Sequence, residues 1–135
     1  MLVIKIGGAA GLDADDITAD IAAHAQAGNQ LVIVHGGSAL ATELGEQLGY
    51  PPRFVTSVSE HTSRYTDTRT LDIFLMATAL LNRQLVAQLQ TLGVNAAGLS
   101  GLDGQMLLAQ RKATLRIVEN GKHKIDLLKF QLTLV

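Results

Sequence analysis

The sequence predicts an α/β domain built on parallel strands, and three features of its 135 residues predict it. Two short, mostly apolar and β-branched runs, 2–6 and 31–35, suit parallel strands buried on both faces. Each run ends in a pair of glycines, and the pairs lie 29 residues apart (36 minus 7). That interval has the length of one strand–helix–strand unit. The residues between the two runs carry a modest helical stripe that ends at Gly28.

The two glycine pairs form a candidate anion-binding site. Parallel strands bring both turns to the carboxyl edge of the sheet, where open α/β sheets bind ligands. A backbone without Cβ atoms can approach a bound group closely, and the N-termini of the following helices favour anions. The alternative is that the glycines only make tight turns. The predicted cradle consists of Gly7, Gly8, Gly36 and Gly37, with Ser38 as the cap of the next helix.

Lys5 is the most informative single residue, because it interrupts an otherwise apolar strand. A buried ammonium is costly unless it reaches a partner or a ligand. If Lys5 points toward the cradle, it can stabilise charge on a transferring phosphoryl group. The competing interpretation places this strand at an edge, with Lys5 facing water.

The remaining elements follow from periodicity and from Gly and Pro positions. Helical spacing predicts a helix that is capped by Ser38 and runs through Leu48, and a long helix over 67–92. A polar, Thr/Ser-rich stretch over 53–66 predicts a short hairpin or an ordered loop. Further strands are predicted at 94–97, 106–109 and 115–118, with a hairpin turn at 120–121 and alternating apolar residues over 128–134.

Composition narrows the function classes. A net charge of −1 disfavours bulk binding to nucleic acid or to a membrane surface. The chain has no cysteine, and its four histidines lack metal-ligand spacing, so no metal site is predicted. The first apolar run is too short for a signal peptide or a membrane span, and the expected location is cytoplasmic.

Several other polar residues have two interpretations each. His35 is expected to position the second turn rather than to act as a base. Arg64 suits the capture of a carboxylate, although arginines in polar loops are usually only solvated. A basic group is expected to be a solvated hairpin surface or a contact for an acidic partner; it consists of Arg111, Lys112, Lys122 and Lys124.

Taken in order, the motifs resemble one known family. They are I-K-I-G-G at 4–8, H-G-G-S-A at 35–39, P-P-R-F at 51–54, S-R-Y-T-D at 63–67, T-L-D-I-F at 70–74, G-L-S-G-L-D-G at 98–104, R-K at 111–112 and V-E-N-G-K at 118–122. Together they closely resemble the amino-acid kinase family, within its acetylglutamate kinase group. The residues of these motifs are most similar to those of kinases that phosphorylate aminoadipate or glutamate held on a small acidic amino-group carrier protein.

This resemblance implies a three-layer αβα sandwich with a mainly parallel sheet, and transfer of the ATP γ-phosphoryl group to a side-chain carboxylate, with Mg²⁺. It implies that Lys5 stabilises the transition state and that Arg64 binds the α-carboxylate of the substrate. It also implies that the two glycine pairs line the phosphoryl path and that the helix over 67–92 forms a homodimer interface. Many acetylglutamate kinases carry a third glycine where this chain has Ser38, which favours the carrier-protein branch.

The resemblance also implies a division of the chain. Residues 1–124 correspond to the N-terminal, substrate-binding part of the family fold, and 125–135 depart from it. Family members continue for about as long again, with most of the ATP-binding region and a second catalytic lysine. A truncated or frameshifted product, inactive by itself, is therefore expected. The alternatives are an N-acetylglutamate kinase and, in another class, a non-catalytic substrate-binding or dimerisation module.

Overall fold

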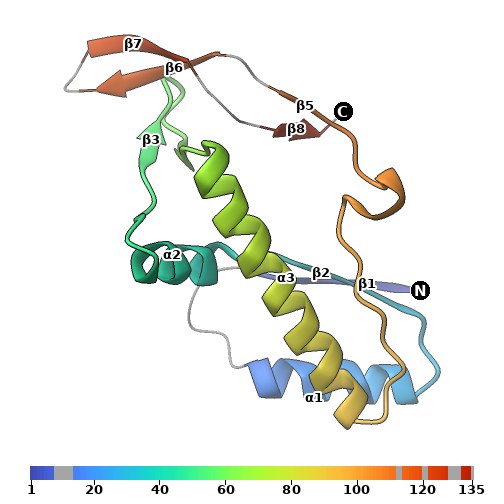
Figure 1. Cartoon of the computed structure of the whole chain (residues 1–135). Coiled ribbons are helices and arrows are strands. Elements are labelled where there is room, and N and C mark those ends of the chain that lie inside the picture. Colours follow the sequence, from blue (N-terminus) through green and yellow to red (C-terminus); the bar gives the residue numbers. More distant parts are fainter. Residues whose placement is uncertain (8–13, 112–113, 120–121, 128–131, 135) are drawn as a thin grey trace. The chain divides into compact units, whose positions relative to one another are not determined.

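The computed structural model describes residues 1–7, 14–111, 114–119, 122–127 and 132–134 (Figure 1). Its residues form two compact units, each assembled from two stretches of chain. Unit 1 contains Met1–Ala41 and Met76–Ser100. Unit 2 contains Thr42–Leu75 and Gly101–Val135. Among the described residues, no helix combines the length and apolar character that crossing a bilayer would require.

Unit 1 contains the predicted strand–helix–strand motif. Strand β1 (Leu2–Ile6) pairs in parallel with β2 (Leu31–His35), and α1 (Ala14–Gln26) connects them. Figure 1 shows the two strands side by side. Helix α1 ends where predicted, because Gly28 takes a positive φ of 85° that side chains disfavour. The α/β class and the parallel pairing are confirmed.

The core of unit 1 covers only one face of this sheet. Three buried residues form its centre: Ile21 and Ala22 of α1, and Leu89 of α3 (Thr68–Thr91). Alternate strand residues pack against them, namely Ile4, Ile6, Leu31 and Ile33. The intervening side chains of the strands are exposed, including Val3 at 65% and Val34 at 51%. The prediction that both faces are buried was therefore wrong for the described residues, which cover one face of a two-stranded sheet.

The predicted strand over 94–97 does not form. Val94 and Ala96 pack against the core of unit 1, whereas Asn95 and Ala97 are exposed, so the side chains alternate as in a strand. The backbone nevertheless makes no ladder: the Val94 N–H donates to Leu89 O, and Ala96 O accepts a side-chain bond from Gln90. Local alternation predicted the side-chain pattern correctly, but a strand also needs a neighbouring strand in register.

The predicted helices over 38–48 and 67–92 are confirmed with small changes at their ends. Helix α2 runs from Ser38 to Gln47, and α3 is the longest element of the chain. Both helices end in turns with a glycine at positive φ, Gly49 and Gly93.

Unit 2 contains the predicted hairpin. Strands β3 (Phe54–Thr56) and β4 (Thr62–Arg64) pair antiparallel. Val55 of β3 is buried against Ile117, and Tyr65 packs on the same cluster. The hairpin prediction over 53–66 is confirmed.

The carboxyl-terminal strands of unit 2 are also antiparallel. Strand β6 (Thr114–Glu119) pairs with β7 (Lys122–Leu127), and β5 (Ala109–Arg111) pairs with β8 (Leu132–Leu134). The hairpin predicted around 120–121 is confirmed by its flanking strands, while these two residues lie outside the described part. The strand predicted over 106–109 begins only at Ala109, after the 3₁₀ turn η1 (Asp103–Gln105).

Candidate functional site

The carboxyl ends of β1 and β2 bring the predicted glycine turns to one edge of the sheet. Ile6 lies beside His35 in the parallel register, and the Gly36 N–H extends the ladder by donating to Ile6 O at 3.3 Å. Gly7 follows β1 and is exposed, and Gly36 follows β2 and is half-buried. Gly8 lies outside the described residues. The parallel pairing therefore places Gly7 and the second glycine pair at the same end of the sheet.

Lys5 is exposed and lies on the face of the sheet that the core of unit 1 does not cover. Its neighbours Ile4 and Ile6 pack toward the core of unit 1, and strand alternation therefore turns Lys5 to the opposite face. It is paired with Val34, one residue before the ladder position of Ile6 and His35. The interpretation of Lys5 as a water-facing residue fits the described residues, and Lys5 lies on the next-to-last pair of the ladder, close to the two turns.

Gly37 makes the closest approach at this edge. It is buried, and a Cβ at this position would lie 2.9 Å from Thr78 Cγ2 of α3. Contacts of that length force a neighbouring atom to move. The Gly37 carbonyl accepts the first bond of α2, from Ala41 N at 2.9 Å, so that Ser38 is the first helical residue rather than the cap that was predicted. The absence of a side chain at Gly37 thus allows the turn before α2 to pack closely against α3.

His35 is held in place by two hydrogen bonds, in agreement with a positioning role. Its Nδ1 lies 3.0 Å from the Gly36 carbonyl oxygen, and its Nε2 lies 3.2 Å from the Asn82 amide nitrogen of α3. Asn82 was not among the residues predicted for the site. Its signal in the sequence was a polar side chain four residues after Thr78, on the largely apolar side of the long helix.

Arg64 belongs to unit 2, where the β3–β4 hairpin and α2 position it. Its Nη2 donates to Thr42 Oγ1 at 2.9 Å, and its guanidinium carbon lies 5.1 Å from the centre of the Phe54 ring. Phe54 is its partner across the hairpin. Burial lowers the pKa of the guanidinium from its ordinary value, since desolvation disfavours the charged form. An oriented, partly desolvated guanidinium binds a carboxylate more strongly than a solvated one.

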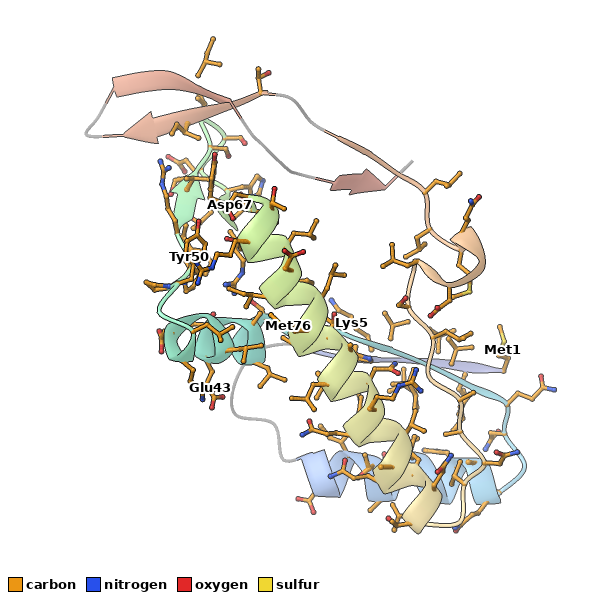
Figure 2. All side chains as sticks on the ribbon, viewed as in Figure 1. Met1, Lys5, Glu43, Tyr50, Asp67 and Met76 are labelled. Atoms are coloured by element: carbon orange, nitrogen blue, oxygen red, sulfur yellow. The ribbon has the colours of Figure 1, made fainter. Side chains whose placement is uncertain are left out.

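The segment after Arg64 is held by Asp67 (Figure 2). One carboxylate oxygen of Asp67 accepts the Tyr50 hydroxyl at 2.6 Å, and the other accepts Thr70 N at 2.8 Å at the start of α3. The hydrogen bond to Asp67 is the main cause that raises the pKa of the Tyr50 phenol, because the carboxylate favours the protonated form. These contacts connect the turn after α2 to the first turn of α3.

Arginine–aromatic pairs recur in this part of unit 2. Arg53 lies 5.0 Å from the Tyr65 ring centre, and Arg69 lies 4.6 Å from that of Tyr50. With the Arg64–Phe54 pair, the three arginines flanking the hairpin each stack on an aromatic ring. Arg53 and Arg69 are exposed, as is usual for loop arginines, but each of the three guanidinium groups also lies over a ring that restricts its position.

Backbone turns next to a lysine suit phosphate oxygens. Within the described ranges, no group of three or more His, Cys, Asp or Glu side chains is placed to hold a metal. Lys112 lies outside these ranges, and the side chains of Arg111, Lys122 and Lys124 are not described, so their contact with an acidic partner stays a prediction.

Comparison with known proteins places these features in one family. The model described as "Amino acid kinase family" matches residues 1–131. Over 126 residues, 93% of the chain, the sequence is 52% identical to LysW-aminoadipate kinase of Deinococcus radiodurans and 46% identical to LysW-aminoadipate kinase of Thermus thermophilus. It is also 39% identical to LysW-aminoadipate/LysW-glutamate kinase of Saccharolobus islandicus. The chain spans 43%, 47% and 47% of the length of these three relatives.

Proposed function

The chain belongs to the amino acid kinase family, and we propose that it forms the substrate-binding part of a kinase acting on carrier-bound amino acids. The acceptor is the side-chain carboxylate of 2-aminoadipate or glutamate, held through its amino group on a small acidic carrier protein. The γ-phosphoryl group comes from ATP with Mg²⁺, and the product is an acyl phosphate used in lysine or arginine biosynthesis. The proposed substrate-binding part is 1–124, with 125–135 as a divergent tail.

One observation carries this proposal: the parallel register of β1 and β2 places Lys5, Gly7 and the Gly36–Gly37 turn at the same end of one sheet. In the proposed reaction a carboxylate oxygen bonds to the γ-phosphorus while the bond to the leaving diphosphate oxygen breaks, and no proton must move. The protein's task is then to place two anionic groups together and to stabilise the charge between them. A lysine ammonium and backbone N–H groups provide that stabilisation.

Roles for the other predicted residues follow from the same chemistry. Ser38, at the first position of α2, adds a hydroxyl next to the second glycine pair. Arg64 receives the α-carboxylate of the acceptor, for which its contacts with Thr42 and Phe54 orient it. The basic group at 111, 112, 122 and 124 docks the acidic carrier; Lys122 and Lys124 stand two residues apart on β7.

We also propose that α3 forms a homodimer interface. Met76 and Leu80 lie four residues apart on this helix and are each 48% exposed, and Ala79 between them is exposed as well. Side chains at this spacing share one face of a helix. An apolar strip of this kind is typical of a surface that a partner covers.

Calorimetry on the 135-residue chain tests the substrate class. The titrants are aminoadipate-loaded carrier, glutamate-loaded carrier, the unloaded carrier, free N-acetylglutamate and ATP-Mg²⁺. The proposal requires a loaded carrier to bind more tightly than the unloaded carrier, with affinity that falls as salt rises. Tight binding of N-acetylglutamate, with no difference between loaded and unloaded carrier, would instead identify an N-acetylglutamate kinase.

A second assay separates catalysis from simple binding. Hydroxylamine trapping measures acyl phosphate after mixing the chain with ATP-Mg²⁺ and the preferred titrant. The 135 residues by themselves are expected to bind the acceptor without turnover. Turnover near about 1 per second, an ordinary enzyme rate, would contradict that expectation. Binding of the carrier or the amino acid with no binding of ATP-Mg²⁺ would favour a non-catalytic module.

A further inference from the structure

Asn82 of α3 contacts the ring of His35, the residue before the second glycine pair. Its amide nitrogen lies 3.2 Å from His35 Nε2, within unit 1. On the same ring, Nδ1 lies 3.0 Å from Gly36 O. A carbonyl oxygen can only accept, so Nδ1 carries the proton that bonds to it, and in the neutral ring Nε2 is then an acceptor. The Asn82 NH₂ group is the donor that this acceptor needs.

The proton position on His35 has a consequence for the turn. The Gly36 N–H already donates to Ile6 O, and the Gly36 carbonyl is fixed by His35 Nδ1–H. No peptide bond among the described residues is cis. In a trans peptide the N–H of the next residue points opposite to the carbonyl. Fixing the Gly36 carbonyl therefore fixes the direction of the Gly37 N–H, at the start of α2.

Asn82 is itself fixed from a second side. Its Nδ2 lies 3.5 Å from Leu99 O, and a Cβ added at Gly98 would overlap Asn82 Oδ1 and lie 2.8 Å from its Cγ. Gly98 therefore leaves room for the amide to lie flat against the chain. Thr78, one helical turn before Asn82, packs against Gly37. Helix α3 thus holds the turn at two points.

We propose that Asn82 is a positioning residue that selects the Nδ1–H tautomer of His35 and so orients the Gly36–Gly37 peptide toward the transferring phosphoryl group. The orientation of that peptide follows from contacts inside unit 1, and its use in phosphoryl transfer rests on the proposed function. Asn82 touches no reacting atom in this scheme. Its effect passes through His35.

The ¹⁵N spectrum of the His35 ring tests the tautomer directly, because protonated and unprotonated ring nitrogens resonate far apart. The 135-residue chain is labelled, and His35 is assigned with a His35→Asn variant. We expect the wild-type chain to carry the proton on Nδ1. The spectra are recorded at a pH where the ring is neutral. In Asn82→Asp the carboxylate can only accept, so the neutral ring carries its proton on Nε2 and the bond to Gly36 O is lost. Gln84→Glu makes the same amide-to-carboxylate change at an exposed position of α3 and should leave the ring unchanged.

Gly98→Ala provides a variant that leaves Asn82 in the sequence. The added methyl group displaces the amide, and the Nδ1–H signal should weaken as in Asn82→Asp. Unchanged amide resonances of β1 and α1 establish that each variant is folded. A wild-type ring protonated on Nε2, or a tautomer that is the same in Asn82→Asp, would overturn the proposal.

A titration with inorganic phosphate tests whether the Asn82–His35 contact affects phosphate binding at the Gly36–Gly37 turn. Phosphate should shift the Gly37 amide resonance of the wild-type chain. In Asn82→Leu, which removes the donor without adding charge, the apparent affinity should fall about fivefold, the worth of one ordering hydrogen bond. Equal affinity in both chains would overturn the link between Asn82 and the cradle. If phosphate shifts neither chain, the phosphate cradle of the proposed function fails, and the ring spectra still decide the role of Asn82.

Discussion

The Tyr50 hydroxyl donates a 2.6 Å hydrogen bond to Asp67 Oδ2, while the other oxygen of the same carboxylate caps α3 by accepting Thr70 N at 2.8 Å. One side chain thus joins the turn after α2 to the start of the longest helix. Arg64 lies three residues before Asp67, and Thr66 between them donates to the Arg64 carbonyl at 3.2 Å. The carboxylate therefore fixes the segment that carries the proposed substrate-binding arginine.

The N-cap role of Asp67 predicts unequal effects for two substitutions. Asp67→Ala removes the cap and should lower the free energy of unfolding by about 1 kcal/mol, the usual effect of losing such a residue. Asp67→Asn keeps a good capping side chain and an acceptor for Tyr50, so its free energy of unfolding should fall much less. Urea unfolding of the two variants measures the difference. Equal losses would show that the charge, and not the cap, stabilises the helix start.

The raised pKa of Tyr50 predicts a stability loss at high pH. Below its ordinary pKa of 10.0 the phenol is protonated in both folded and unfolded chains, and the bond to Asp67 contributes fully. As pH rises past that value the unfolded chain releases the proton first, and stability falls until the folded phenol also ionises. Urea midpoints from pH 8.5 to 11 should therefore fall less for Tyr50→Phe than for the wild-type chain. Parallel curves would contradict this prediction.

The contacts of Arg64 predict that lysine cannot replace it. Lysine lacks the planar fork that stacks on Phe54 and donates to Thr42. Arg64→Lys should weaken binding of the loaded carrier about tenfold or more, the worth of one charge-assisted hydrogen bond. Arg53→Lys is the matched control, because Arg53 also stacks on an aromatic ring beside the same hairpin. Calorimetry measures the affinity of both variants for the loaded carrier. Equal losses of affinity in Arg64→Lys and Arg53→Lys would show that the effect comes from hairpin stability.

The exposed strip on α3 predicts a change of oligomeric state. Leu80→Glu places a carboxylate beside Met76 and Ala79 and should convert a dimer to a monomer in light scattering after size exclusion. Leu48→Glu makes the same change at another exposed leucine, 46% accessible in the turn after α2. The control should stay dimeric. A wild-type chain that is monomeric at all concentrations would rule out this interface for the 135 residues.

Sequence periodicity predicted the helices and the parallel pairing, because each depends on local spacing and on glycine positions. The helix predicted over 67–92 differs from α3 by one residue at each end. The exposure of Lys5 was not decided, since a strand's own residues do not say which face another layer will cover. The strand expected at 94–97 failed for a related reason: its alternation was real, but ladder partners come from distant residues.

Within the site, Gly37 was predicted but Asn82 was not. A glycine pair at a strand end has a known physical use, whereas an asparagine within a helix has many. Its role became visible only when His35 and Gly98 were found on either side of it. The arginine–aromatic pairs were not predicted for a similar reason. Arg69 and Tyr50 are separated by 19 residues (69 minus 50), and only the tertiary structure brings them into contact.

The contact between Gly37 and α3 predicts a steric coupling that a double-mutant cycle can measure. Gly37→Ala should destabilise unit 1 by about 1–3 kcal/mol, because the new Cβ would lie 2.9 Å from Thr78 Cγ2. Gly37 is not among the glycines with positive φ, so the cost comes from this clash and not from backbone strain. Thr78→Ser deletes the clashing methyl group and keeps the hydroxyl. In the double variant most of the cost of Gly37→Ala should disappear, giving a coupling of about 1 kcal/mol or more. Additive losses would mean that the Gly37 backbone, rather than Thr78, resists the added methyl group.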